Sequence, residues 1–162
     1  MGQIVRFGCL VDLRSSETLQ SVKLINDKEA FAKYYDVEQM ILQNYKFPSI
    51  FLRQTKKAFV SFVTPSMIDI VKKGSFGIPK NLPTYNALRL TCQRKGITCD
   101  LRFARKIQAS WLHRYNVPDV MIDLLQGRVG KSVLVNHYLA PSLDHKAKVL
   151  QALEKLKEDI EQ

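Results

Sequence analysis

Four residues in the second half of the chain could together hold a phosphate. Arg102 and Arg105 are three positions apart, so on a helix they share one face. Arg128 directly follows a Gln-Gly pair that is typical of a helix end, and Tyr138 stands ten residues further along the chain. Two arginines on one helix, a third after a helix end and a tyrosine beyond it predict one phosphate surrounded by fixed positive charge.

Such a group suits cleavage of a phosphodiester without a metal ion. Guanidinium groups are always charged and bind phosphate bidentately, so several of them can neutralise it. Tyrosine suits a reversible nucleophile, because its phenolate is a fair leaving group and the phosphotyrosine conserves the bond. The sequence offers no convincing carboxylate cluster for magnesium, since Asp119 and Asp123 flank a helix cap and Glu17 is remote. We therefore expect neither a metal nor a cofactor.

The predicted helices explain how the arginines could be positioned. The helix with Arg102 and Arg105 has an apolar side that should pack on a core. That side consists of Ile107, Trp111 and Leu112. A second short helix should begin at 117–119, with a proline in its first turn, and end at 126–127. Its end places Arg128 directly beyond the helix.

Two earlier segments also carry cations at predicted element ends. Arg14 precedes a helix start and is followed by Glu17, a pair that alone indicates a surface arginine beside a helix N-terminus. Strands predicted over 49–53 and 58–63 form a hairpin. Its tip carries Lys56 and Lys57, which would ordinarily lie in a solvated turn.

These residues resemble the catalytic C-terminus of the tyrosine recombinases, and most of all the archaeal integrases of spindle-shaped viruses and related plasmids. The matching pattern is Arg102-x-x-Arg105, then Gln126-Gly127-Arg128, then Asn136-His137-Tyr138. The usual family pattern is His-x-x-Arg, then Gly-His or Gly-Trp, then Tyr. Arg102 and Arg128 therefore depart from it, in a way that is a habit of the archaeal branch. Arg14 and Glu17 match the family's first catalytic arginine and the glutamate thought to hold it.

The resemblance implies roles in strand cleavage. Arg14 and Arg105 would grip the non-bridging phosphate oxygens, and Arg128 would add a third contact. Tyr138 would attack the phosphate and hold the 3′ end. Lys56 would protonate the 5′ oxygen as general acid, with Lys57 as the reserve.

The proton chemistry leaves two further residues to assign. Arg102 occupies the general acid–base position of the family, but it stays protonated, so it would act electrostatically. His137 remains a second candidate for accepting the tyrosine proton. The residues expected to contact DNA outside the catalytic set are Lys57, Lys106 and Lys131.

The fold class predicted is α+β and mainly helical, with a small antiparallel hairpin or sheet on one edge. We expect one domain over residues 1–162, a recombinase catalytic domain without the N-terminal DNA-clamping domain of full integrases. Further helices are predicted over 1–13, 27–44, 65–73 and 84–94. A last amphipathic helix after Pro141 could dock on its own domain or on a neighbour. Its apolar stripe consists of Leu143, Ala147, Leu150, Leu153, Leu156 and Ile160.

The charge balance favours a polyanionic partner. The chain has 162 residues with 25 basic and 15 acidic side chains, a formal net charge of +10. Three cysteines without metal-ligand spacing and no apolar run of membrane length predict a cytoplasmic protein. The resemblance implies that it is associated with the nucleoid of a host cell. The resemblance implies double-stranded DNA as the partner, a tetramer on paired attachment sites and a monomer in free solution.

Two other functions are compatible with the same residues. A type IB topoisomerase uses a similar catalytic set but relaxes DNA without partner sites. A non-catalytic basic DNA-binding module would have Tyr138 as a packed side chain only. A covalent protein–DNA adduct would separate that module from both enzymes.

Overall fold

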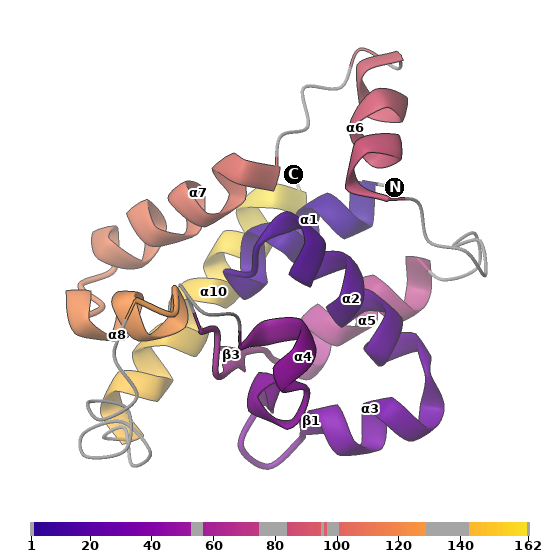
Figure 1. Cartoon of the computed structure of the whole chain (residues 1–162). Helices are drawn as coiled ribbons and strands as arrows, with labels where there is room; N and C mark the ends of the chain where they lie inside the picture. The colour runs from indigo at the N-terminus through magenta and orange to yellow at the C-terminus, as the bar shows by residue number, and fades with distance from the viewer. Residues whose placement is uncertain are drawn as a thin grey trace.

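A computed structural model describes residues 2–52, 57–74, 84–94, 96, 101–128 and 143–161 (Figure 1). Within these residues the protein is mainly helical with a small antiparallel sheet, as the sequence predicts. Nine α-helices lie there: α1 (Gly2–Val11), α2 (Ser15–Asn26), α3 (Lys28–Tyr34), α4 (Pro48–Phe51), α5 (Pro65–Gly74), α6 (Tyr85–Arg94), α7 (Leu101–Arg114), α8 (Asp119–Leu125) and α10 (Leu143–Glu161). The remaining elements are a 3-10 helix, η1 (Asn44–Lys46), and the strands β1 (Tyr35–Asp36), β2 (Ile41–Leu42) and β3 (Ser61–Phe62).

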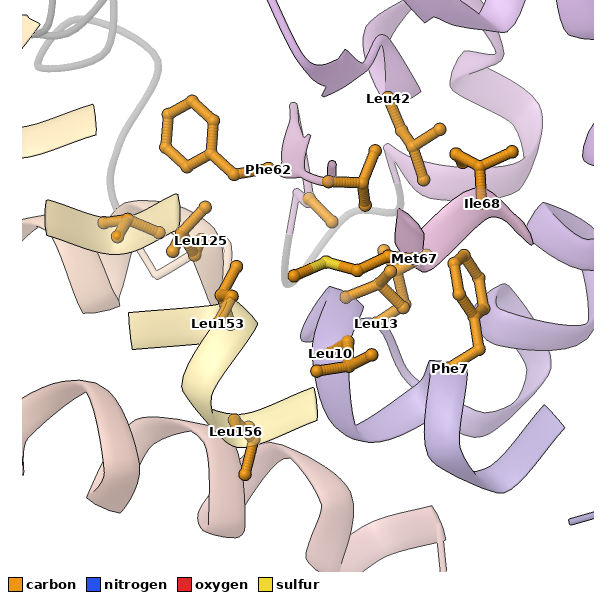
Figure 2. Close-up of a cluster of buried hydrophobic side chains, with 14 of the residues drawn as sticks. Phe7, Leu10, Leu13, Leu42, Phe62, Met67, Ile68, Leu125, Leu153 and Leu156 are labelled. Carbon is orange, nitrogen blue, oxygen red and sulfur yellow. The ribbon is translucent and has the colours of Figure 1, made fainter. Parts of the chain in front are cut away.

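Helix α1 lies at the centre of the core. It packs against α2, α5, α7 and α10, and its residues Phe7 and Leu10 are fully buried. Figure 2 shows apolar side chains from the sheet, α5, α8 and α10 gathered around this helix. Besides Phe7 and Leu10, the labelled side chains are Leu13 from the loop after α1 and Leu42, Phe62, Met67, Ile68, Leu125, Leu153 and Leu156 from the other elements. Segments far apart in sequence therefore share one hydrophobic core.

Helix α10 belongs to this core and lies along α7 (Figure 1). Its most buried residues are Val149, Ala152, Leu153 and Leu156. The Trp111 indole nitrogen donates a hydrogen bond to the Ala152 carbonyl at 2.9 Å. Of the two alternatives that the sequence left open, docking on its own domain is the one observed. Ala147 of the predicted stripe is exposed, because the buried face runs through Val149 instead.

The continuous helix predicted over 27–44 is wrong beyond Tyr34. Helix α3 ends there, and β1 and β2 follow as an antiparallel pair. The Asp36 carboxylate accepts a hydrogen bond from the Gln39 backbone at 2.9 Å, and Met40 adopts a φ of 49°. Aspartate side chains that bond the backbone a few residues ahead favour turns over helices. The aromatic spacing in this segment reflects burial of side chains and not one long helix.

The strand predicted over 49–53 is also wrong, because Pro48–Phe51 forms helix α4 with proline in its first turn. The chain nevertheless reverses where the hairpin was predicted, since Leu52 and Lys57 form an antiparallel bridge. The residues 53–56 lie outside the described part. The second predicted strand contains β3, which pairs with β2 in a sheet of order β1-β2-β3.

Helix α7 buries only part of the predicted apolar side, since Leu112 is buried and Trp111 packs against the core but Ile107 does not. Ile107 is 48% exposed, whereas Ala104, Gln108 and Leu112 are buried at a spacing of four residues. The Gln108 amide donates to the Leu10 carbonyl of α1 at 2.6 Å. A polar residue in the middle of the buried stripe hides that stripe from a search for apolar periodicity.

Candidate functional site

The candidate site is built around the short loop between α1 and α2. Asp12 adopts a left-handed φ of 53°, which aspartate tolerates better than most residues. The preceding residues are fixed from two sides. The Ser61 hydroxyl of β3 donates to the Val11 carbonyl at 2.9 Å, and Gln108 of α7 bonds Leu10. Both the sheet and α7 therefore set where this loop lies.

Arg14 ends the loop and caps α2. The Glu17 carboxylate accepts hydrogen bonds from the Arg14 backbone nitrogen and from its Nη1, both at 3.0 Å. Glu17 is buried, and the Arg14 side chain is 26% exposed. The contact that was expected between this glutamate and this arginine is present. It holds a guanidinium at the protein surface while leaving part of it open to solvent.

Arg105 projects from α7 toward the same loop. Its Nε lies 3.3 Å from Asp12 Oδ1, and its Nη2 donates to the backbone carbonyl of Gln126 at the end of α8. The Gln126 side chain returns a hydrogen bond to the Arg105 carbonyl at 3.3 Å. Within the described residues, Arg105 Nη1 makes no hydrogen bond or ion pair. Three segments distant in sequence thus orient this guanidinium, and none of the described residues bonds its Nη1.

Arg128 follows the glycine that ends α8. Gly127 has a φ of 64° and packs so closely on the chain at Lys57 that an added Cβ would lie 2.5 Å from the Lys57 carbonyl oxygen. The Lys57 backbone nitrogen donates to the Gly127 carbonyl at 3.2 Å. The Arg128 guanidinium is 57% exposed and lies 3.3 Å from the exposed Asp123 carboxylate. The backbone of Lys57 and the glycine that precedes Arg128 therefore lie side by side.

The Asp12 carboxyl group interacts electrostatically with Arg105 of α7 and with Arg128 beyond α8. Burial raises the pKa of Asp12 to about 7, and the positive charges of Arg105 and Arg128 oppose that rise. Its Oδ2 is buried without a hydrogen-bond partner in the described residues. A carboxylate that is 2% exposed thus lies in the field of two of the arginines predicted to bind phosphate.

No protein-family model, no curated protein and no solved structure matches this chain. Function must therefore be argued from its residues and their arrangement. In the described part, no three or more His, Cys, Asp or Glu side chains are grouped so that they could hold a metal ion. None of the helices described is long and apolar enough to cross a membrane.

The other residues predicted for the site either lie outside the described part of the structure or line a separate groove. Arg102 lies in the first turn of α7, but its side chain is outside the described part. Lys56, Lys131 and Tyr138 also lie outside it. Lys106 is described, and it lines an open groove between α7 and α10 of about 440 Å³. The structure therefore groups Lys106 with that groove and not with Arg105 and Asp12.

Two residues of the site were missed by the sequence interpretation. Asp12 stands alone in an otherwise apolar run, and that isolation was the available signal that its carboxylate is buried. Gln126 was taken only as part of a helix end, yet it is buried and exchanges two hydrogen bonds with Arg105. No local pattern announces the second contact, because its partners are 21 residues apart.

Proposed function

We propose that this chain is the catalytic domain of a site-specific DNA recombinase of the tyrosine type. It would cleave and rejoin DNA without a metal, through a 3′-phosphotyrosine intermediate. The observation that supports the proposal is the environment that two of the predicted phosphate ligands share at Asp12. Arg105 and Arg128 both act on the carboxylate of Asp12, and Arg14 is two residues from it in the chain. Fixed cations from separate elements are what neutralisation of one phosphate requires.

The proposed reaction is a reversible transfer of a phosphoryl group. The Tyr138 oxygen attacks the phosphorus and gives its proton to His137, the candidate acceptor, so a tyrosine–phosphorus bond forms while the bond to the 5′ oxygen breaks. Lys56 gives a proton to that 5′ oxygen, with Lys57 as the reserve. The arginines stabilise the charge that develops on the non-bridging oxygens. Rejoining follows the same steps in reverse, because the phosphotyrosine conserves the bond.

The substrate proposed is double-stranded DNA carrying attachment sites. The net charge of +10 supports a polyanionic partner whose binding weakens as salt rises. The resemblance adds a tetramer on paired sites that dissociates to monomers in free solution. Helix α10 is buried in its own domain along Val149, Leu153 and Leu156, so that face is not available to link neighbouring protomers.

A second candidate function is favoured by one specific observation. Arg105 is bonded to Asp12 and to the Gln126 carbonyl, and Arg128 is paired with Asp123. Arginines with protein partners can be purely structural. The second candidate is therefore a non-catalytic basic module that binds DNA through exposed lysines and arginines.

The deciding experiment traps the covalent intermediate. The probe is a library of nicked duplexes with a randomised central sequence, incubated with the whole chain in excess EDTA. We expect an SDS-resistant adduct from the wild type and from the control Tyr45→Phe, whose side chain is exposed. Tyr138→Phe should give no adduct while keeping its salt-sensitive binding. A wild type that binds duplex but forms no adduct would establish the second candidate instead.

A further inference from the structure

Among the described residues, the partners of the Arg105 guanidinium lie along one of its edges. In arginine, Nε–H and one Nη2–H point the same way and form a side-on edge, whereas Nη1 and the other Nη2–H form the end-on edge. Asp12 and the Gln126 carbonyl occupy the side-on edge. Within the described residues the end-on edge bonds nothing, and the Arg105 side chain is 18% exposed. The described part of the protein thus binds one half of the fork, and none of its groups bonds the half that an outside acceptor could use.

We propose that Asp12 is a positioning residue that turns the end-on edge of Arg105 toward the DNA phosphate. The identity of the bound group as a DNA phosphate rests on the proposed function, whereas the contact between Asp12 and Arg105 does not. Nε of Arg105 is 3.3 Å from Asp12 Oδ1, and the loop that carries Asp12 is fixed by Ser61 and Gln108. A rigid anchor on Nε fixes the plane of the guanidinium, and oriented bidentate donors depend on that plane.

The charge of Asp12 is not needed for the backbone. Asparagine and glycine adopt a left-handed φ at least as readily as aspartate, and neither leaves a buried charge. Asp12 instead places a carboxylate in a site where Oδ2 has no partner among the described residues. Such a group is costly to bury, so an orienting role for its charge accounts for its presence. The charged groups that act on it are Arg105 from α7 and Arg128 beyond α8, both cationic.

The charge state of Asp12 should change within the neutral range. Because burial raises its pKa to about 7, the carboxyl is largely protonated at pH 5.5 and largely ionised at pH 8.5. The ionised form is the stronger acceptor for Arg105 Nε. The orientation of Arg105, and any chemistry that depends on it, should therefore improve as pH rises through about 7.

The test follows the Nε–H signal of Arg105 by NMR in the whole chain, assigned from its loss in Arg105→Lys. In the wild type this signal should titrate near pH 7 and should shift when duplex DNA is added. In Asp12→Asn the Arg105 signal should not titrate near pH 7, and its shift on addition of DNA should be smaller. Asp119→Asn is the matched control, since it removes an exposed carboxylate that pairs with His113. That control should behave as the wild type.

Adduct formation gives the second readout. Asp12→Asn should slow it by about 10–100-fold with duplex affinity changed less than about threefold, the effect of a misdirected ligand. An Arg105 signal identical in wild type and Asp12→Asn would overturn the proposal, and so would an unchanged adduct rate. If the wild type forms no adduct at all, the proposed function fails, and the NMR response to DNA alone decides the role of Asp12. If Asp12→Asn does not fold, the wild type alone still tests the proposal. An Arg105 Nε–H chemical shift that does not change between pH 5.5 and 8.5 would overturn the proposal.

Discussion

Arg105 and Arg128 act on the same buried carboxylate but are held in opposite ways. Arg105 comes from the long helix α7, and its guanidinium is bonded by Asp12 and by a backbone carbonyl. Arg128 comes from the chain beyond α8, and its ion pair is with Asp123, whose side chain is 47% exposed. The Arg105 side chain is 18% exposed and that of Arg128 is 57% exposed.

If both arginines bind phosphate as proposed, the difference separates a fixed ligand from an adjustable one. Ordering a long side chain costs conformational entropy, and for Arg105 that cost is met when the protein folds. Arg128 would lose its freedom only when a phosphate binds. A preorganised donor contributes more to a transition state than one that must be ordered first. The two arginines should therefore respond unequally to the same substitution.

Removing the support that both arginines share should have the largest effect. Truncation after Pro141 deletes α10, which buries Val149, Leu153 and Leu156 against the core. Burial of such side chains contributes about 1.5–3 kcal/mol each, and a whole domain is stable by only about 5–15 kcal/mol. The truncated chain should show no cooperative melting and neither DNA cleavage nor pairing of sites.

A milder variant checks that this loss comes from packing. Leu153→Ala should lower the free energy of unfolding by about 2–5 kcal/mol, because Leu153 is 1% exposed. Ala147→Ser, on the exposed side of the same helix, should change it by less than about 0.5 kcal/mol. A truncated chain that melts as the full chain does would show that α10 is dispensable for folding.

The next effect concerns the carboxylate between the two arginines. The folded-state pKa of Asp12 is raised from 3.8 to about 7, so its protonated form stabilises the fold below about pH 4. That stabilisation should be lost progressively as pH rises from about 4 to about 7. Denaturant unfolding at several pH values should show this decline in the wild type and not in Asp12→Asn. Asp123→Asn keeps Asp12 and should keep the decline.

Lysine substitutions compare the arginines directly. Arg105→Lys retains the charge but cannot bond Asp12 and the Gln126 carbonyl with one planar fork, so adduct formation should fall by about 100-fold or more. Arg128→Lys keeps an exposed cation and should lower the rate by less than about tenfold. Single-turnover rates on the trapped substrate measure both. Equal losses would remove the distinction between a fixed and an adjustable ligand.

Gly127 packs against the chain at Lys57 and so fixes the backbone from which Arg128 projects. Gly127→Ala should lower the free energy of unfolding by about 2–3 kcal/mol. An added Cβ would lie 2.5 Å from the Lys57 carbonyl oxygen and 2.9 Å from the Ala58 nitrogen, so backbone must move. Gly96→Ala is the matched control, since Gly96 has a similar φ of 66° but no atom of the described residues within 4 Å of a Cβ. That control should cost only about 1 kcal/mol, the strain of the left-handed backbone alone. Thermal melting of both variants separates contact from strain.

The parts of the fold that could be predicted are those with local signals. Thr64 and Pro65 correctly mark the start of α5, and the Thr84 hydroxyl caps α6 by accepting from the Ala87 nitrogen at 3.3 Å. Gly127 correctly marks the end of α8. The contact of Arg14 with Glu17 was within reach for the same reason, since its partners are three residues apart.

The rest depends on contacts that no local pattern contains. Asp12 and Arg105 are 93 residues apart, and their pairing exists only because α1 packs on α7. Helical spacing over 27–44 suggested one helix, whereas the segment turns at Asp36 and its second strand, β2, pairs with the distant β3. Tyr34, the last residue of α3, is buried. Its hydroxyl bonds Ser21 at 3.0 Å and Asn44 at 2.6 Å. Tertiary packing there overrides the local helical preference.

The smallest effect should come from releasing Arg128 from its ion pair. Asp123→Asn removes a contact of 3.3 Å between two side chains that are both about half exposed, and exposed pairs contribute only about 0.2–1 kcal/mol. The melting temperature should therefore change little, and the residual change should shrink further as salt rises. The Arg128 guanidinium, freed of its competitor, should bind duplex DNA slightly more tightly at low salt. A large loss of stability from Asp123→Asn would mean that Arg128 is a structural arginine like Arg105, and the contrast between them would disappear.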